Sequence, residues 1–260
     1  MKIKTTMETN NLFDLKRLLL LMRRQIFSSA KSLLIAFGGM AGTLLIISLL
    51  VAYFNPPALS GMVPLYFVVM FIGGYVFTSN IYFELHQVQR SYSYLTLPVS
   101  LTERLVSAWL ITGPLFAVFS LLAMLLIGLA GNLVMQLLNG TMPFNLVIFT
   151  GSLKTIGIYL VTQSVFLLGA VYFRKNNFLK TLLALFLVSL ALNIYSGLVG
   201  WGLFRSLSGD MVMMEGQVVI APLENLMTKV LPAVFKFIFW YLTIPFFLVT
   251  TWFSLKERQV

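Results

Sequence analysis

The sequence predicts an all-α, polytopic membrane protein with six transmembrane helices, both termini in the cytoplasm and an N-terminal amphipathic helix at the membrane interface. Of its 260 residues, 59% are hydrophobic and only 10% are charged, whereas an average soluble domain has about 25% charged residues. So few charges cannot cover a core of this size, and the excess apolar surface must face lipid. The second observation is that six apolar runs each approach the roughly 20 residues needed to cross a bilayer.

The six runs divide the chain into one short segment and one membrane domain. Residues 1–31 form a cytoplasmic N-terminal segment, and residues 32–260 form a single six-helix domain. The expected spans cover approximately residues 32–54, 62–81, 105–129, 150–173, 178–203 and 233–255. Because six is even, both ends of the chain lie on the same side of the membrane.

The distribution of charge predicts the orientation. The net charge is +10, and 14 of the 18 basic residues lie in the N-terminal segment, the second and fourth connections and the C-terminal tail. By the positive-inside rule these parts are cytoplasmic. Lys154 and Lys236 fall near the outer ends of their runs and are expected to extend to the interface. Topology therefore explains the basicity without a nucleic-acid partner, and we expect a multi-pass protein of the plasma membrane, specifically the bacterial inner membrane.

Two stretches do not fit a plain bundle. The third run stays apolar to Leu138, and at 1.5 Å per residue such a helix would be about 50 Å long, against a hydrocarbon core of roughly 30 Å. Gly113-Pro114, Gly128 and Gly131 are therefore points where it could kink, end or turn back. The outer segment 206–232 mixes charged and apolar residues, so it either lies flat on the membrane or enters it as a re-entrant element.

Basic residues at positions 16, 17, 23 and 24 recur one heptad apart among leucines in the N-terminal segment. On a helix they share one face, opposite a broad apolar surface. This pattern predicts a helix in the inner interface, with its basic side chains toward anionic headgroups. The alternative is that the segment simply begins the first span.

Residues that carry chemistry are scarce. His86 is the only histidine and there is no cysteine, so a multi-histidine or thiolate metal site is excluded. We interpret His86 as a solvated surface residue and expect neither catalysis nor a cofactor. No P-loop motif is present. The glycines of 38–42 and Gly73-Gly74 predict close helix packing, and helix–helix hydrogen bonds are expected, ahead of a pore-facing role, for Asn80, Gln163, Ser164, Asn193 and Ser196.

The connection 82–104 is the most informative cytoplasmic element. Pro98 disfavours a helix at Leu97, and Ser100 followed by Glu103 has the form of a capping box that starts a new helix. Tyr92, Tyr94 and Leu97 would then be exposed on an elbow suited to docking a soluble partner.

The run from Tyr94 to Arg104, YLTLPVSLTER, resembles a segment that follows the second span in many permease subunits of ABC-2 type ABC transporters. That segment has Leu-Pro, then Val or Ala, then Ser, and three residues later Glu followed by Lys or Arg. The whole plan of the chain is also similar to that family. Length, N-terminal amphipathic helix, six spans and a long outer segment before the last span all agree.

The resemblance implies a permease subunit, with no catalysis of its own, that forms a homodimer or heterodimer and works with a separate cytoplasmic ABC ATPase, in an exporter. In that family this loop packs against the ATPase and transmits its closure. The implied docking residues are Tyr92, Tyr94, Leu97, Pro98, Val99, Ser100, Glu103 and Arg104, with Glu103 available for an ion pair across the interface. Accordingly, Glu103→Lys is expected to leave the protein folded but to uncouple ATP hydrolysis from transport.

Two other functions remain open on the sequence. The first is a membrane accessory or assembly protein that docks a cytoplasmic partner without moving a substrate. The second is an intramembrane enzyme, which the lack of catalytic residues disfavours. The substrate is not indicated by any residue pattern.

Overall fold

The computed structural model describes residues 13–87, 98–140, 149–209 and 229–257. Within these residues the chain is helical, with short connections and no strand, and six helices are long and apolar enough to cross a membrane. This confirms the predicted all-α fold and the number of spans. The six candidates are Leu34–Phe54, Val63–Asn80, Leu101–Leu137, Leu153–Tyr172, Asn177–Gly202 and Leu231–Glu257.

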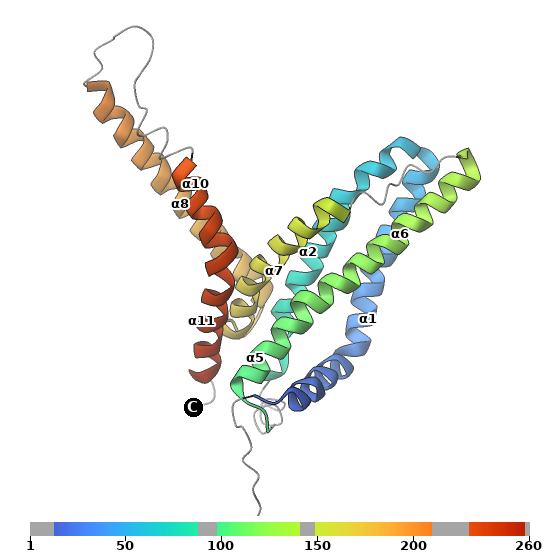
Figure 1. The fold of residues 1–260 in the computed structure, drawn as a ribbon, viewed down its shortest axis with the longest axis horizontal. Coiled ribbons are helices and arrows are strands. Elements are labelled where there is room, and N and C mark those ends of the chain that lie inside the picture. The colour runs from blue at the N-terminus through green and yellow to red at the C-terminus, as the bar shows by residue number, and fades with distance from the viewer. Residues whose placement is uncertain (1–12, 88–97, 141–148, 210–228, 258–260) are drawn as a thin grey trace, which may run out of the picture.

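The N-terminal half contains α1, a short 3-10 helix η1, α2 and the single-turn α3. Helix α1 is one continuous helix of 40 residues, about 60 Å at 1.5 Å per residue. Figure 1 shows that it runs across one end of the molecule and then turns to rise along α6. The expected interfacial helix and the first span are therefore one helix that changes direction. The bounds are Leu15–Phe54 for α1, Pro56–Met62 for η1, Val63–Asn80 for α2 and Phe83–His86 for α3.

The third apolar run forms a single long helical path in three parts. Helix α5 (Leu101–Leu110) continues through a π-helical turn, η2 (Ile111–Leu115), into α6 (Phe116–Asn139). Pro114 lies inside the π turn, where it removes one backbone donor and distorts the ladder. The path ends at Gly140, whose φ of 66° is a conformation favoured by glycine. The expected end at residue 129 is therefore ten residues too early, and the helix does not stop at Gly128 or Gly131.

The C-terminal half contains the remaining three spans. Helix α7 differs from its predicted bounds by one residue at each end, and a four-residue connection joins it to α8. The last span runs through α10, a second π turn η5, and α11. The bounds are Phe149–Tyr172 for α7, Asn177–Gly209 for α8, Leu231–Phe237 for α10, Ile238–Leu242 for η5 and Thr243–Glu257 for α11.

The helices form two groups, which Figure 1 shows diverging as a V. Helices α1, α2, α5–α6 and α7 pack together, whereas α8 and α10–α11 lean away from them. The groups meet where α11 packs on α7. There, Leu255 joins a buried cluster with Leu105, Tyr82 and Leu167.

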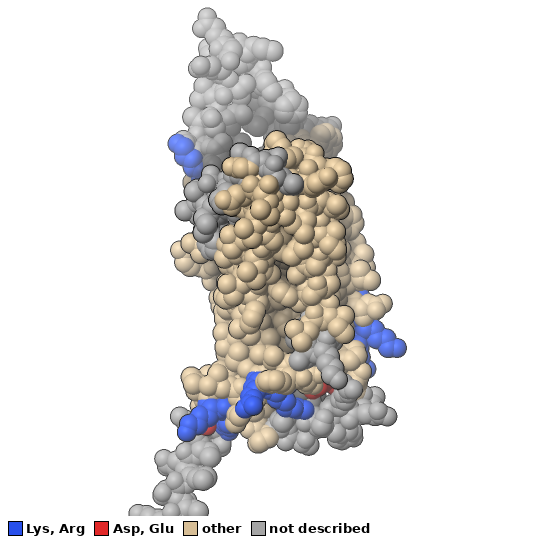
Figure 2. Space-filling model, turned by 90° about the vertical axis from the view of Figure 1, so that its right-hand side faces the viewer, with Lys and Arg blue, Asp and Glu red and all other residues tan. Residues whose placement is uncertain are grey.

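Basic side chains gather at one end of the bundle, and the middle of the face in Figure 2 carries no charged residue. We call this end the basic end. It contains the start of α1, α3, the start of α5, the α7–α8 connection and the end of α11. The positive-inside rule predicts that such an end faces the cytoplasm.

Candidate functional site

The predicted docking loop lies at the basic end, between α3 and α5. Residues 88–97 lie outside the described residues, and with them Tyr92, Tyr94 and Leu97. Of the rest, Pro98 is exposed, Val99 and Ser100 are half-buried, and Glu103 and Arg104 are buried. The C-terminal flank of the loop, residues 98–104, is thus part of the folded bundle.

Ser100 and Glu103 form the predicted capping box at the start of α5. The Ser100 hydroxyl accepts a hydrogen bond from the Glu103 backbone N–H at 3.2 Å, and the Ser100 backbone N–H donates to Glu103 Oε2 at 2.8 Å. Two donors that a helix start leaves unpaired are thereby satisfied. The prediction from the Ser-x-x-Glu spacing is confirmed.

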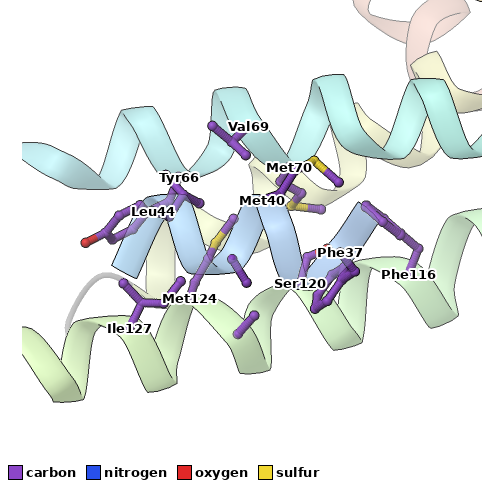
Figure 3. A pocket seen from close by; sticks show the side chains of 12 residues that line it. Phe37, Met40, Leu44, Tyr66, Val69, Met70, Phe116, Ser120, Met124 and Ile127 are labelled. Atoms are coloured by element: carbon purple, nitrogen blue, oxygen red, sulfur yellow. The ribbon is translucent and has the colours of Figure 1, made fainter. Parts of the chain in front are cut away.

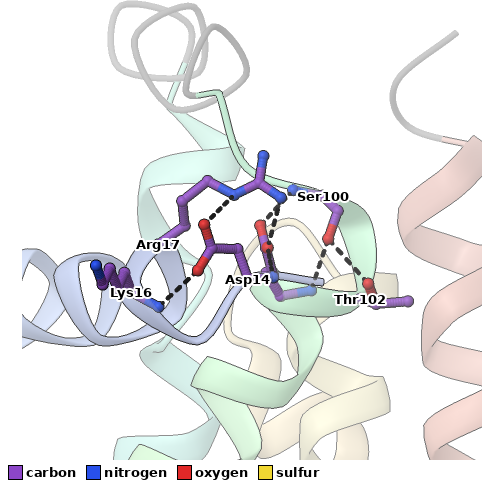
Figure 4. Close-up of polar contacts among 6 residues, drawn as sticks. Asp14, Lys16, Arg17, Ser100 and Thr102 are labelled. Atoms are coloured by element: carbon purple, nitrogen blue, oxygen red, sulfur yellow. Dashed lines mark hydrogen bonds and ion pairs between the residues drawn. The ribbon is translucent and has the colours of Figure 1, made fainter. Parts of the chain in front are cut away.

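Glu103 also holds the beginning of α1. Its Oε1 accepts the Asp14 backbone N–H at 2.7 Å and lies 3.2 Å from Nη2 of Arg17. The Glu103 side chain is 0% exposed. Figure 4 shows Arg17 reaching from α1 toward this point beside Ser100. One carboxylate therefore joins the start of α1 to the start of α5 across a long stretch of sequence.

This geometry corrects two expectations for Glu103. Because both carboxylate oxygens have partners inside the chain and the side chain is buried, Glu103 is not on the surface where a separate subunit could pair with it. A lysine at this position would also place a second positive charge next to Arg17. We therefore expect Glu103→Lys to destabilise the start of α1 and α5 rather than to leave the fold unchanged.

A second, weaker contact connects α1 to the first flank of the loop. Glu84 of α3 accepts a hydrogen bond from the Ser28 hydroxyl at 3.1 Å and lies 3.9 Å from Arg24 Nη2. The Arg24 and Glu84 side chains are 39% and 27% exposed, so solvent screens this pair. Helix α1 thus contacts both flanks of the loop.

The basic residues of α1 divide into two sets rather than sharing one role. Arg17 and Arg24, one heptad apart, pair with acidic side chains of this chain, which corrects the expectation that all four basic residues face headgroups. Lys16 and Arg23, the other pair one heptad apart, are exposed, and the Arg23 guanidinium lies over the Phe27 ring at 5.7 Å. Of these four residues, Lys16 and Arg23 are the most exposed and the best placed to contact headgroups.

His86 is fixed rather than solvated, which corrects its interpretation as a free surface residue. Its Nε2 lies 2.8 Å from the carbonyl oxygen of Ala170, and the side chain is half-buried. This contact links α3 to the end of α7. The sequence around His86 gives no sign of this contact, because the partner of His86 is a backbone atom 84 residues away.

The candidate pore residues lie in three different environments. Gln163 and Ser164 are fully buried, and Gln163 donates from Nε2 to the Thr112 hydroxyl of η2, which is the expected helix–helix bond. Asn80 is exposed and donates to its own helix at Val76. Asn193 and Ser196 are exposed on α8, and their described hydrogen bonds are to backbone carbonyls of the same helix. No described contact joins either residue to Gln163.

The π turn η2 is attached to α7 by a second bond. The Tyr159 hydroxyl donates to the Thr112 carbonyl oxygen at 2.6 Å. Just after the π turn, the Phe116 backbone N–H is shared between the Ile111 and Gly113 carbonyl oxygens. The π turn that contains Pro114 is thereby part of the helix packing.

An apolar groove separates α1 from α2, with α6 as its floor. Its inner part is lined by Phe37, Met40, Leu44, Tyr66 and Met124, among others, and Figure 3 shows these side chains converging from the three helices. Its outer part, along Gly39, Thr43 and Leu65, has a volume of about 470 Å³.

The small residues near this groove do not all pack as predicted. Gly38, Gly39 and Gly42 have open space where a Cβ would lie, so the expected close packing is absent there within the described chain. Gly74, in contrast, packs against the Tyr159 ring, as predicted.

Comparison with family models, with curated proteins and with solved structures finds no match to this chain. Within the described residues, no three His, Asp or Glu side chains lie together in a way that could hold a metal ion.

Proposed function

We propose that this protein is the membrane-spanning subunit of an ABC-2 type ATP-driven exporter and that it works with a separate cytoplasmic ATPase. The observation that carries the proposal is the Glu103 contact, which joins the loop between α3 and α5 to the first turns of both α1 and α5. A partner that pushes on this loop would move two spans together.

The path of such a movement follows from the packing. Helix α5 continues into η2, and η2 is bonded to α7 through Tyr159 and Gln163. Because π-helical turns are frequently found at functional sites, η2 is the natural place for the long α5–α6 path to change its angle. Displacement of α5 would then alter how α6 lies against the groove between α1 and α2.

A second permease subunit is part of the proposal. Residues 182–202 of α8 are all exposed, and Gly197, Gly200 and Gly202 have open space beside them. Small residues on a lipid-facing helix allow a second helix to approach closely. We therefore place contact with the second subunit on α8, and the substrate path would run between subunits.

The partner is tested by affinity purification of the tagged protein in mild detergent, followed by mass spectrometry. We expect a P-loop ATPase in near-stoichiometric amount. The double variant Tyr92→Ala/Tyr94→Ala is expected to lose it. Tyr172→Ala is the matched control, because Tyr172 is an aromatic residue at the same end and is 68% exposed.

A different partner would indicate the alternative function. Near-stoichiometric recovery of a protein that is not an ATPase, lost in the same double variant, would favour an accessory protein that uses the loop for docking without transport. Loss of the ATPase in the Tyr172→Ala control as well would mean that the loop is misassigned.

A further inference from the structure

A cavity opens at the basic end. It lies between the end of α2, α3 and the α7–α8 connection and has a volume of about 430 Å³, within the range of roughly 300–1,000 Å³ typical of ligand pockets. Its charged and polar lining includes Arg174, Lys175, His86 and Asn80. None of the residues that line it is acidic.

The wall of the cavity is held by contacts between four helices. The Asn177 amide donates to the Ser79 carbonyl oxygen at 3.2 Å and to the Ala170 carbonyl oxygen at 3.3 Å. His86 Nε2 lies 2.8 Å from the same Ala170 oxygen. The ends of α2, α3 and α7 and the start of α8 are therefore fixed relative to one another, and the cavity is a feature of the packing.

The connection that carries the two cations has a defined backbone. Asn176 has φ of 54°, a left-handed conformation that asparagine tolerates, and this turn places Arg174 and Lys175 directly before α8. The backbone N–H groups of a helix start attract negative charge, and here they add to two positive side chains.

Part of the rim of the cavity is apolar. Phe83 is 52% exposed and Leu179 is 61% exposed, and both line the cavity. From Leu179 the exposed apolar surface continues along α8 through Leu182 and Phe186. A ligand that fits needs a negative head for the basic side and hydrocarbon for the α8 side.

We infer that this cavity binds the phosphate headgroup of an anionic membrane lipid, with Arg174 and Lys175 as the charged contacts and the acyl chains along α8. Basic pockets between transmembrane helices at a membrane surface recognise such headgroups. A phosphate from solution would satisfy the cations but would leave the apolar rim and the α8 surface without a role. The inference does not depend on transport or on an ATPase.

The test uses the purified full-length protein and measures lipid binding by native mass spectrometry. Phosphatidylglycerol is compared with phosphatidylcholine, which has the same acyl chains and no net charge. We expect phosphatidylglycerol to bind more tightly, and Arg174→Gln/Lys175→Gln to weaken its binding roughly 10- to 30-fold, with little change in phosphatidylcholine binding.

The control variant is Lys180→Gln/Lys256→Gln. It removes two charges from the same end, and neither residue lines the cavity. It is expected to bind phosphatidylglycerol as the unmodified protein does. Equal weakening in both double variants would mean that general surface charge, and not this cavity, attracts the lipid, and would overturn the inference.

A competition arm identifies the source of the phosphate. Glycerol phosphate added at the concentration of the lipid should not displace phosphatidylglycerol, because it lacks the acyl chains. Displacement at that concentration would show that the site takes a soluble phosphate. That result, or the absence of any preference for phosphatidylglycerol, would overturn the assignment to a lipid.

Discussion

The first four spans and the last two differ in how much of their surface this chain buries. In the most apolar stretch of α7, 50% of the residues are buried, and the share is 33% in α2 and in α5–α6 and 11% in α1. In α8 and in α10–α11 it is 0%. The first group has buried side-chain hydrogen bonds and a glycine in contact with a ring, whereas the last two spans contact the rest mainly where α11 meets α7.

The two regions are therefore held in place in different ways. The positions of α2, α5–α6 and α7 follow from contacts within the chain, so their packing is fixed in the monomer. The upper part of α8 has only lipid or another protein to face.

The largest difference is expected for glycine. Gly74→Ala places a methyl group against the buried Tyr159 ring, and we expect the free energy of unfolding to fall by about 2–3 kcal/mol, as overpacking of a core does. Gly200→Ala on α8 enters open space and should change it by less than about 0.5 kcal/mol. Denaturant titration in detergent measures both.

An equal loss of stability in the two glycine variants would contradict the comparison. It would mean that α8 is already packed against something in the purified protein. A second copy of the chain would then be visible as a change in oligomeric state between the unmodified protein and Gly200→Ala.

A smaller difference is expected for tyrosine. Tyr159→Phe leaves the buried Thr112 carbonyl without its side-chain donor and should cost about 1–2 kcal/mol of unfolding free energy. Tyr195→Phe, at a position on α8 that is 68% exposed, should have no measurable effect. If Tyr159→Phe were also neutral, the bond between α7 and η2 would not contribute to stability.

The two ion pairs of α1 provide the finest comparison. A double-mutant cycle with Arg17→Gln and Glu103→Gln should give a coupling of about 1–2 kcal/mol, because Glu103 is buried and hydrogen-bonded. The same cycle with Arg24→Gln and Glu84→Gln should give about 0.5 kcal/mol or less, because both side chains are partly exposed. Equal coupling energies for the two pairs would mean that the Glu103 contact is no stronger than the Glu84 contact.

Hydropathy predicted the fold well because the cost of burying charge in lipid is local in the sequence. The bounds of α7 and the count of six spans followed from it, and the capping box followed from the spacing of Ser100 and Glu103. The end of α6 did not, because apolarity alone does not say where a helix leaves the membrane. Gly140, with its positive φ, is the residue that marks that end.

The contacts of the candidate site were predicted less well, because they join distant parts of the chain. The turn of α1 brings Arg17 to Glu103, and the sequence contains no local signal for that turn. Similarly, His86 bonds to the Ala170 carbonyl, a group that every residue carries. The openness of Gly38 and Gly42 depends on neighbours that the sequence does not specify.

The central claim is that an ATPase binds the loop between α3 and α5. Because the chain has no cysteine, Tyr92→Cys creates a single site for cross-linking in native membranes, before any detergent is added. We predict an adduct that contains a P-loop ATPase, and no such adduct from Tyr172→Cys at the same end. An adduct at position 92 with a protein that is not an ATPase, or equal cross-linking from both positions, would contradict the account.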